Sequence, residues 1–233
     1  MLFAAALLSG CLDFDELTTR SPRSLSDGGP TQDGQVGDAD ANVARGPCDG
    51  VECKDDGNIC TKNLCNPESG KCEARRFCRR VFVTAGKYSG DLEGPKGADS
   101  KCKGSAEAGN LGGQWSAWVA GDDHPHESIA TSTLPFHRLD GTEIARGGAS
   151  LGSAPLLAAI DITEQGTMVM DPPWAWTGLS ASGGAEGPSC DEWTTGKSNL
   201  KGQIGYPSKL TGLWTSADAL FCDRKGHLYC FEL

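Results

Sequence analysis

Residues 97–118, GADSKCKGSAEAGNLGGQWSAW, join a helix pattern to a strand pattern and decide the fold of the second half of the chain. Small side chains recur at Ala98, Cys102 and Ala106, which is the spacing of one buried helix face. Gly109-Asn110 then supplies residues that commonly end a helix. The segment therefore predicts a helix packed through small residues.

Local residue types set the expected boundaries of these elements. Asp99 and Ser100 are capping residues, so we expect one of them to cap the amino end of the helix. Gln114–Val119 carries two tryptophans among small and apolar residues, and we interpret it as a strand.

Further strands and a hairpin are expected on both sides of this segment. Asp140-Gly141 suits the positive φ angles of a tight hairpin turn. Together with the helix, these segments predict an α+β domain over residues 79–233. The expected strands and the hairpin are Arg80–Thr84, Arg138–Ile144, Trp174–Gly178 and Leu228–Glu232.

The eleven cysteines divide as one, six and four along the chain. The six are Cys48, Cys53, Cys60, Cys65, Cys72 and Cys78. No Cys-x2-Cys pair occurs and no histidine lies among these six, so disulfides in an oxidising compartment are favoured over zinc. Six cysteines allow fifteen pairings, and the sequence does not choose among them.

Residues 48–78 are too few to bury a core and need covalent bridges. The intervals between their cysteines nearly alternate, and Cys53–Thr61 is followed by Cys65-Asn66-Pro67 and Gly70-Lys71-Cys72. This pattern resembles the extracellular cysteine-rich unit known as the slime-mould repeat. We interpret the module as a rigid spacer, with a ligand-binding module as the alternative.

The first residues resemble the export signal of bacterial lipoproteins. An apolar run, Met1–Leu8, precedes Ser9-Gly10-Cys11, which is similar to a lipobox, although no Lys or Arg precedes it. The resemblance implies a signal peptide over 1–11 and acylation of Cys11, which would hold the protein to a membrane. Residues 12–47 have few large apolar groups and predict a disordered tether, and Asp33–Asp40 fits an acidic linker better than a calcium loop.

The anchors of residues 79–233 resemble those of endostatin-type domains. They are Gly97-Ala98-Asp99, Cys102, Leu111–Trp115, Ala117-Trp118, Trp176-Thr177-Gly178, Cys190-Asp191-Glu192-Trp193, Cys222 and Tyr229-Cys230. The same order occurs in an uncharacterised domain family of predicted bacterial lipoproteins. The resemblance implies a C-type-lectin-like fold with nested disulfides, Cys102 with Cys230 and Cys190 with Cys222.

The formal net charge of −10 argues against binding to nucleic acid. The one basic run is Arg75, Arg76, Arg79 and Arg80, and we interpret it as a solvated linker between the two modules. No apolar stretch is long enough for a membrane-spanning helix.

All six tryptophans lie in the domain, and we expect at least four of them in its core. Trp174, Trp193 and Trp214 are the candidates for an exposed ring that stacks on a sugar. His124 and His126 are candidate metal ligands, but such polar runs are usually solvated loops, so neither a metal nor a cofactor is predicted.

An enzyme is not predicted. Gly148-x-Ser150-x-Gly152 matches the nucleophile elbow of serine hydrolases, which needs a strand before it and a helix after it, and the flanking residues do not indicate that context. Asp191 and Glu192 are adjacent, and neighbours on a strand face opposite ways, so they make poor acid–base partners.

These features favour a lipid-anchored protein of the bacterial cell envelope, at the outer membrane or cell surface. It would present a lectin-like binding or adhesion domain to an extracellular glycan or protein. Two alternatives remain: a structural envelope component without a soluble ligand, and an extracellular polymer-degrading hydrolase.

Overall fold

The computed structural model describes residues 46–122, 125, 127–153, 155–169 and 173–233. Cys11, the tether, His124 and His126 lie outside the described residues. The elements are β1 Thr61–Cys65, β2 Cys72–Arg76, β3 Arg79–Val83, α1 Gly94–Ala108, β4 Trp115–Ala117, α2 Glu127–Ala130, β5 Phe136–Arg138, β6 Glu143–Ala145, α3 Gly148–Ser153, β7 Ala175–Trp176, α4 Cys190–Trp193, β8 Lys201–Gly205, η1 Gly212–Trp214, β9 Asp218–Phe221 and β10 His227–Glu232. Among these residues, no helix is long and apolar enough to cross a membrane.

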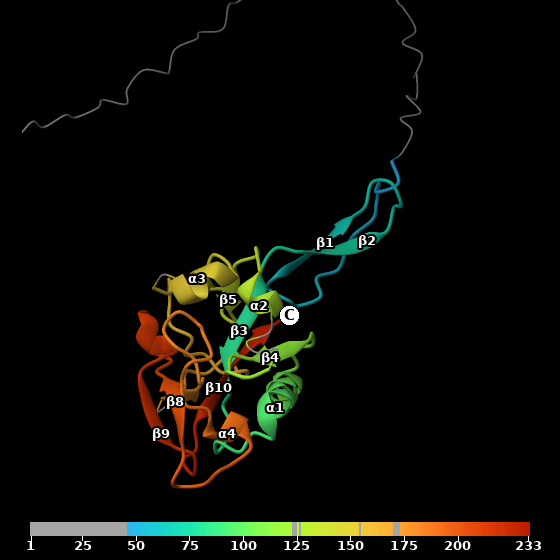
Figure 1. The fold of residues 1–233 in the computed structure, drawn as a ribbon. Coiled ribbons are helices and arrows are strands. Elements are labelled where there is room, and N and C mark those ends of the chain that lie inside the picture. The colour runs from blue at the N-terminus through green and yellow to red at the C-terminus, as the bar shows by residue number, and fades with distance from the viewer. Residues whose placement is uncertain (1–45, 123–124, 126, 154, 170–172) are drawn as a thin grey trace, which may run out of the picture. The chain divides into compact units, whose positions relative to one another are not determined.

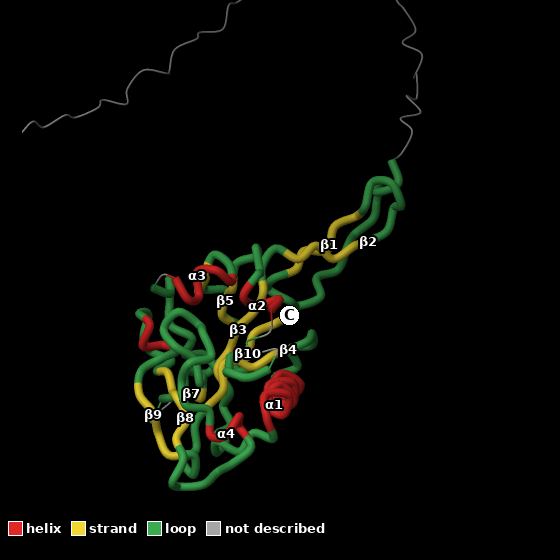
Figure 2. The backbone as a smooth tube through the Cα atoms, viewed as in Figure 1, coloured by secondary structure: helices red, strands yellow, loops and turns green. Residues whose placement is uncertain are grey.

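Strand β10 organises the large sheet, whose order is β6-β5-β3-β10-β7-β8-β9 with β4 also paired to β10 (Figure 1). It pairs antiparallel with β3 and β4 and parallel with β7. All six of its residues are buried. Loops make up much of the remaining chain (Figure 2), as expected for a sequence with 32 glycines.

The alternation of side chains along β10 separates two hydrophobic clusters. Tyr229 and Phe231 belong to one cluster, with Val81 and Val83 of β3. Leu228 and Cys230 belong to the other, with Phe82 of β3 and the buried face of α1. Successive strand residues point to opposite faces, so a single central strand contributes to both cores.

Helix α1 presents the small-residue face that the sequence indicates. Ala98, Cys102 and Ala106 are buried, and a disulfide joins Cys102 to Cys230 of β10. The helix ends at Gly109, and Asn110 takes a left-handed φ of 55°. Close packing of the helix against the sheet follows from these short side chains.

The predicted cap of α1 is wrong, because the helix begins at Gly94, before both proposed capping residues. Pro95 lies in its first turn, where proline is favoured because its missing N–H would be unpaired in any case. Asp99 lies inside the helix instead, and its Oδ1 accepts hydrogen bonds from Ser116 Oγ (2.9 Å) and Ala117 N (2.7 Å). It therefore fastens α1 to β4.

The predicted hairpin is present as β5 and β6, but its turn differs from the expected one. Within it only Gly141 has a positive φ, of 87°. The Arg138 N–H donates to Thr142 O (2.8 Å), and Arg138 O accepts from the Gly141 N–H (2.9 Å). This is the pattern of a three-residue loop that ends in a left-handed glycine. The strands predicted at 114–119 and 174–178 are shortened to β4 and β7.

The cysteine-rich module is a two-stranded hairpin of β1 and β2. Its disulfides join Cys48 to Cys65, Cys53 to Cys72 and Cys60 to Cys78. Each of the first three cysteines is thus bonded to the third one after it, a pairing that the sequence left open. All residues of β2 are exposed, so the covalent bridges rather than a core hold this module.

Candidate functional site

All six tryptophans are buried, which agrees with the expectation that at least four of them lie in the core. None of the three candidates for stacking on a sugar, Trp174, Trp193 and Trp214, therefore presents an exposed ring. Trp193 is 0% exposed and its Nε1 donates to Ala120 O at 2.7 Å. Trp214 is 1% exposed and stacks on Trp118 at 5.4 Å between ring centroids. Large aromatic rings fill the two cores here, because burial of each ring contributes more than its exposure would.

Trp174 differs from the other two, because it lines an open groove of about 550 Å³. The residue is 7% exposed. The groove is lined by Trp174, Leu220, Phe221, Arg224 and Lys225. We call these five residues the aromatic–basic groove.

The fold builds this groove where β9 ends and the turn to β10 begins. Phe221 is the last residue of β9, the edge strand of the large sheet, and its side chain is 45% exposed. Residues 222–226 then turn back towards β10, and the buried Cys190–Cys222 disulfide anchors the start of that turn.

A glycine permits the close approach of Trp174 to this turn. A Cβ added at Gly226 would lie 2.1 Å from the Trp174 ring, which is too close for any side chain. Trp174 also meets Trp176 edge to face at 4.8 Å, and the Trp176 Nε1 donates to Tyr88 O at 2.9 Å. The wall of the groove is therefore held by packing on both sides, which favours a preformed site.

The rim of the groove is positively charged in a chain of net charge −10. Arg224 and Lys225 are exposed, and Lys201, opposite Phe221 in the sheet register, holds its Nζ 5.1 Å from the Phe221 ring centroid. Asp223 is the acidic residue of the same turn. The sequence signal for this rim is the run Phe221-Cys222-Asp223-Arg224-Lys225-Gly226, which was not among the predicted sites.

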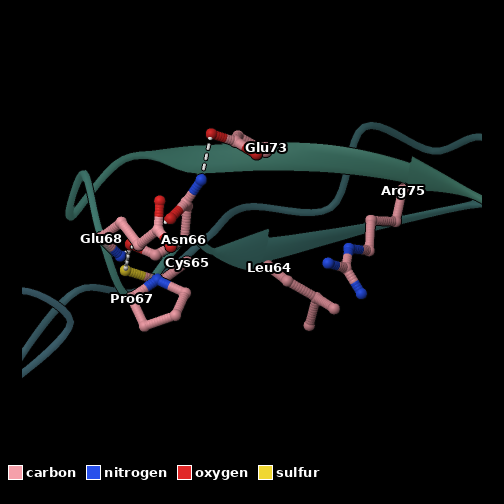
Figure 3. Close-up of a pocket in the computed structure, with 7 residues that line it drawn as sticks. All are labelled: Leu64, Cys65, Asn66, Pro67, Glu68, Glu73 and Arg75. Carbon is pink, nitrogen blue, oxygen red and sulfur yellow. Dashed lines mark hydrogen bonds between the residues drawn. The ribbon is translucent and has the colours of Figure 1, made fainter.

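A second hollow, of about 480 Å³, lies on the cysteine-rich module (Figure 3). Two of its polar side chains, Asn66 and Glu73, are already hydrogen-bonded within the module. The Asn66 Oδ1 accepts from the Glu68 and Ser69 N–H groups, and its Nδ2 donates to Glu73 Oε1 at 2.7 Å. These bonds stabilise the turn between β1 and β2. The residues that line this hollow include no aromatic ring, unlike those of the aromatic–basic groove.

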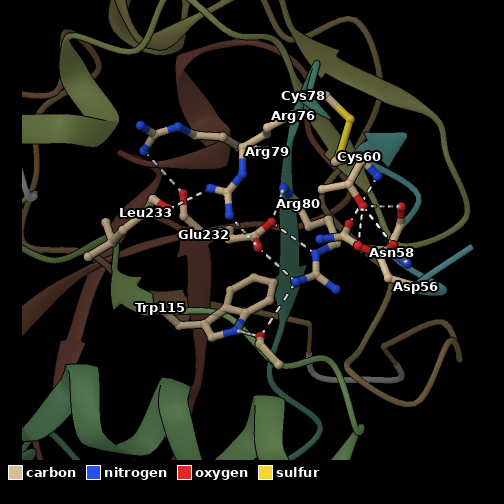
Figure 4. A network of polar contacts seen from close by, with 12 residues as sticks. Asp56, Asn58, Cys60, Arg76, Cys78, Arg79, Arg80, Trp115, Glu232 and Leu233 are labelled. Atoms are coloured by element: carbon tan, nitrogen blue, oxygen red, sulfur yellow. Dashed lines mark hydrogen bonds and ion pairs between the residues drawn. A yellow bond between two sulfur atoms is a disulfide. The ribbon is translucent and has the colours of Figure 1, made fainter. Parts of the chain in front are cut away.

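The prediction of a solvated linker at the basic run is wrong for Arg76, Arg79 and Arg80, which bond to the last strand of the domain (Figure 4). Arg80 is 4% exposed and donates to the fully buried Glu232 carboxylate through Nε (2.9 Å) and Nη2 (2.8 Å). Arg76 of β2 donates to the same carboxylate at 3.3 Å and to Leu233 O at 2.7 Å. The run joins the module to the last strand of the domain instead.

The elbow motif lies in an unexpected context, because strand β6 precedes it and helix α3 follows it. Ser150 nevertheless lies inside α3, and its Oγ donates to Gly147 O at 2.8 Å. No histidine or carboxylate is bonded to it among the residues that the structure describes. A serine nucleophile needs a base within hydrogen-bond reach, so this arrangement does not support the motif as catalytic.

Asp191 and Glu192 do not lie on a strand, contrary to the sequence analysis. They belong to a left-handed turn in which Cys190, Asp191, Glu192 and Trp193 have φ angles of 51°, 55°, 53° and 64°. Both carboxylates are exposed. The described residues contain no group of three or more His, Cys, Asp or Glu side chains arranged to hold a metal.

His227 is the buried titratable group nearest to the groove in sequence. Its side chain is in contact with Thr84 O through Nδ1 at 2.6 Å, and Nε2 is buried without a partner. Burial lowers the pKa of its imidazole, the hydrogen bond to Thr84 opposes this shift, and the nearby Lys87 charge adds to it. A neutral, enclosed imidazole of this kind fits a structural role better than proton transfer with a ligand.

The structure thus assigns a mixed α and β fold, mostly sheet with few helices and several disulfides, to the described residues. Its open groove combines the exposed Phe221 ring with the basic side chains of Arg224 and Lys225. No protein-family model and no curated protein matches this chain.

Proposed function

We propose that this protein is a non-enzymatic binding protein of the bacterial cell envelope, and that the aromatic–basic groove is its binding surface for an extracellular glycan. The observation that carries the proposal is the half-exposed Phe221 ring, which lines the groove together with Trp174, Arg224 and Lys225. Aromatic faces bind the C–H faces of sugars, and a few polar groups beside them fix the orientation of a ligand.

The proposed architecture is C-type-lectin-like. Its first strand, β3, pairs with its last strand, β10, and the nested bridges Cys102–Cys230 and Cys190–Cys222 agree with the resemblance to endostatin-type domains. These observations support the proposal, together with the long loops between short strands. The scaffold alone does not name a ligand, so the argument for binding depends on the groove.

A Phe221→Ala variant should bind its glycan about tenfold more weakly than the native chain, because it loses an exposed stacking face. The matched control is Phe77→Ala, since Phe77 is 50% exposed but does not line the groove. A glycan array probed with both variants and the native chain measures the effect. Equal binding by all three proteins contradicts the proposal, and absence of any bound glycan favours a structural envelope component.

Retention at a membrane is the second part of the proposal and depends on Cys11 in the lipobox-like run Leu8-Ser9-Gly10-Cys11. A Cys11→Ser variant expressed in a bacterial host should move from the membrane fraction to the soluble fraction, because it lacks the acylated thiol. Fractionation with a Ser9→Ala variant as the control measures this. Unchanged membrane association of Cys11→Ser would remove the anchor from the proposal.

A further inference from the structure

We propose that the aromatic–basic groove selects an acidic polysaccharide that carries about one carboxylate per sugar ring. This inference rests on the proposed function, since it names the ligand class of the same groove. The observation behind it is that three cationic side chains of this region, Lys201, Arg224 and Lys225, have no ion-pair partner among the described residues.

Other exposed cations of the domain, including Lys87, Lys197 and Lys209, also lack an ion pair among the described residues. What sets Lys201, Arg224 and Lys225 apart is that they gather around one exposed aromatic ring. Arg80 and Arg138 form ion pairs at 2.8 Å and 2.6 Å, and Lys101 and Lys103 also have carboxylate partners. A chain with 31 acidic and 21 basic residues has carboxylates in excess. Cations left unpaired beside one groove of such a chain form a local surface that complements an anion.

The arrangement of these cations suits a chain of sugars. Arg224 and Lys225 lie in the turn after β9, whereas Lys201 lies across from Phe221 on β8. Lys201 Nζ therefore lies over one face of the Phe221 ring, 5.1 Å from its centroid, while Arg224 and Lys225 line the groove beside the ring. A sugar stacked on Phe221 places its own carboxylate, or that of the next sugar, within reach of either side, and an Arg fork matches a carboxylate with two hydrogen bonds.

The charge of the whole chain favours a polymer of moderate charge density. A net charge of −10 repels a highly charged polyanion over long distances. Asp223 also lies in the same turn as Arg224 and Lys225, which limits the local positive charge. A uronic acid polymer, with a single carboxylate on each ring, fits these conditions better than a heavily sulfated one.

The test compares oligogalacturonate with its methyl ester, because the two share a backbone and differ in charge. The full chain, with its disulfides intact, should bind oligogalacturonate at least about tenfold more tightly than the ester in a calorimetric titration. The double variant Arg224→Ala/Lys225→Ala should lose about tenfold in affinity for the acid and little for the ester. The control Lys54→Ala/Lys62→Ala removes the same charge from the exposed surface of the module and should bind like the native chain.

The outcomes separate this inference from the proposed function. Equal affinity for the acid and the ester, with loss of both in Phe221→Ala, overturns the carboxylate inference and supports the groove. An equal loss in the Lys54→Ala/Lys62→Ala control overturns the local role of Arg224 and Lys225. Tighter binding of dextran sulfate than of oligogalacturonate overturns the choice of a singly charged sugar. Failure to bind any of these ligands, and no effect of Phe221→Ala on a glycan array, overturns both proposals.

Discussion

A Cys190→Ala/Cys222→Ala variant should have a free energy of unfolding about 3–4 kcal/mol below that of the native chain. The bridge spans a sequence separation of 32 residues, and the loss of loop-closure constraint for such a loop has this magnitude in the chain-entropy model. Both cysteines are buried, at 1% and 0% exposure. The cavity left between them adds to the loss.

The bridge also holds an unusual backbone segment. Residues 190–193 form four consecutive left-handed conformations without a glycine, and each costs about 1–2 kcal/mol. Two contacts oppose this cost besides the disulfide: the buried Trp193 ring, whose Nε1 donates to Ala120 O at 2.7 Å, and the bond from Leu92 N to Trp193 O at 2.8 Å. Without the bridge we expect the turn to relax and to release Trp193 from the core.

Two measurements check this result. Chemical denaturation gives the loss of stability, and near-ultraviolet circular dichroism reports the surroundings of the tryptophans. The control Cys48→Ala/Cys65→Ala removes a bridge of sequence separation 17 from the module, and it should leave the tryptophan signal unchanged because all six tryptophans lie beyond residue 114. A loss below about 1 kcal/mol in the first variant, with an unchanged spectrum, would contradict the expectation.

Glycine substitutions test whether the left-handed residues of this turn are strained. Glu192→Gly should leave stability unchanged or raise it by up to about 1 kcal/mol, because glycine adopts the left-handed region without a steric penalty. Glu107→Gly, in the ordinary helix α1, should lower stability by about 0.5–1 kcal/mol. Equal losses in both variants would mean that residue 192 does not bear the strain that its φ of 53° indicates.

The sequence could not reveal this turn, because consecutive left-handed residues are normally glycines. Helix α1 and strand β10 were predictable, since their patterns are local: Ala98, Cys102 and Ala106 share one helix face, and β10 is a short apolar run. The cap of α1 was missed because proline geometry in the first turn started the helix at Gly94. Local sequence patterns predicted the structure correctly in those segments where no contact with a distant part of the chain overrode them.

The candidate site depends on contacts that the sequence does not display. Trp174 and Phe221 are distant in the chain, and they meet only because β7 pairs with both β8 and β10 while Gly226 makes room for the indole. The basic turn at 223–225 can be identified from the sequence. Its position in one groove with the Trp174 ring cannot. The same limit applies to the basic run at 75–80, whose carboxylate partner Glu232 lies about 150 residues away.

A Glu232→Ala variant should lose about 3–5 kcal/mol of stability, because removal of one partner leaves a buried charge without compensation. The Glu232 carboxylate is fully buried and accepts three hydrogen bonds from Arg80, through its N (3.2 Å), Nε (2.9 Å) and Nη2 (2.8 Å). A Cβ at Gly113 would lie 2.8 Å from Glu232 Oε1, so the pocket around this carboxylate is tight. Chemical denaturation of the purified protein measures the loss.

A double variant distinguishes the stability cost of an unpaired buried charge from the cost of losing a contact alone. Arg80→Met/Glu232→Leu removes both charges and should recover much of the stability lost in Glu232→Ala, since a buried ion pair is often replaceable by apolar groups of similar volume. The surface pair Lys103–Glu107, at 3.8 Å with both side chains exposed, is the matched control. Glu107→Ala should change stability by less than about 1 kcal/mol.

The same variant should loosen the contact between the module and the domain. Arg76 of β2 donates to Glu232 Oε1 at 3.3 Å and to Leu233 O at 2.7 Å, so Glu232→Ala removes one of its two partners. The Cys60–Cys78 bridge remains, and it keeps the chain connected at this point. Hydrogen exchange should therefore quicken in β2 and at the start of β3 in Glu232→Ala, whereas β8 and β9 exchange at native rates. Uniform acceleration across the domain would indicate that Glu232 stabilises the whole sheet and does not act specifically at the junction with the module.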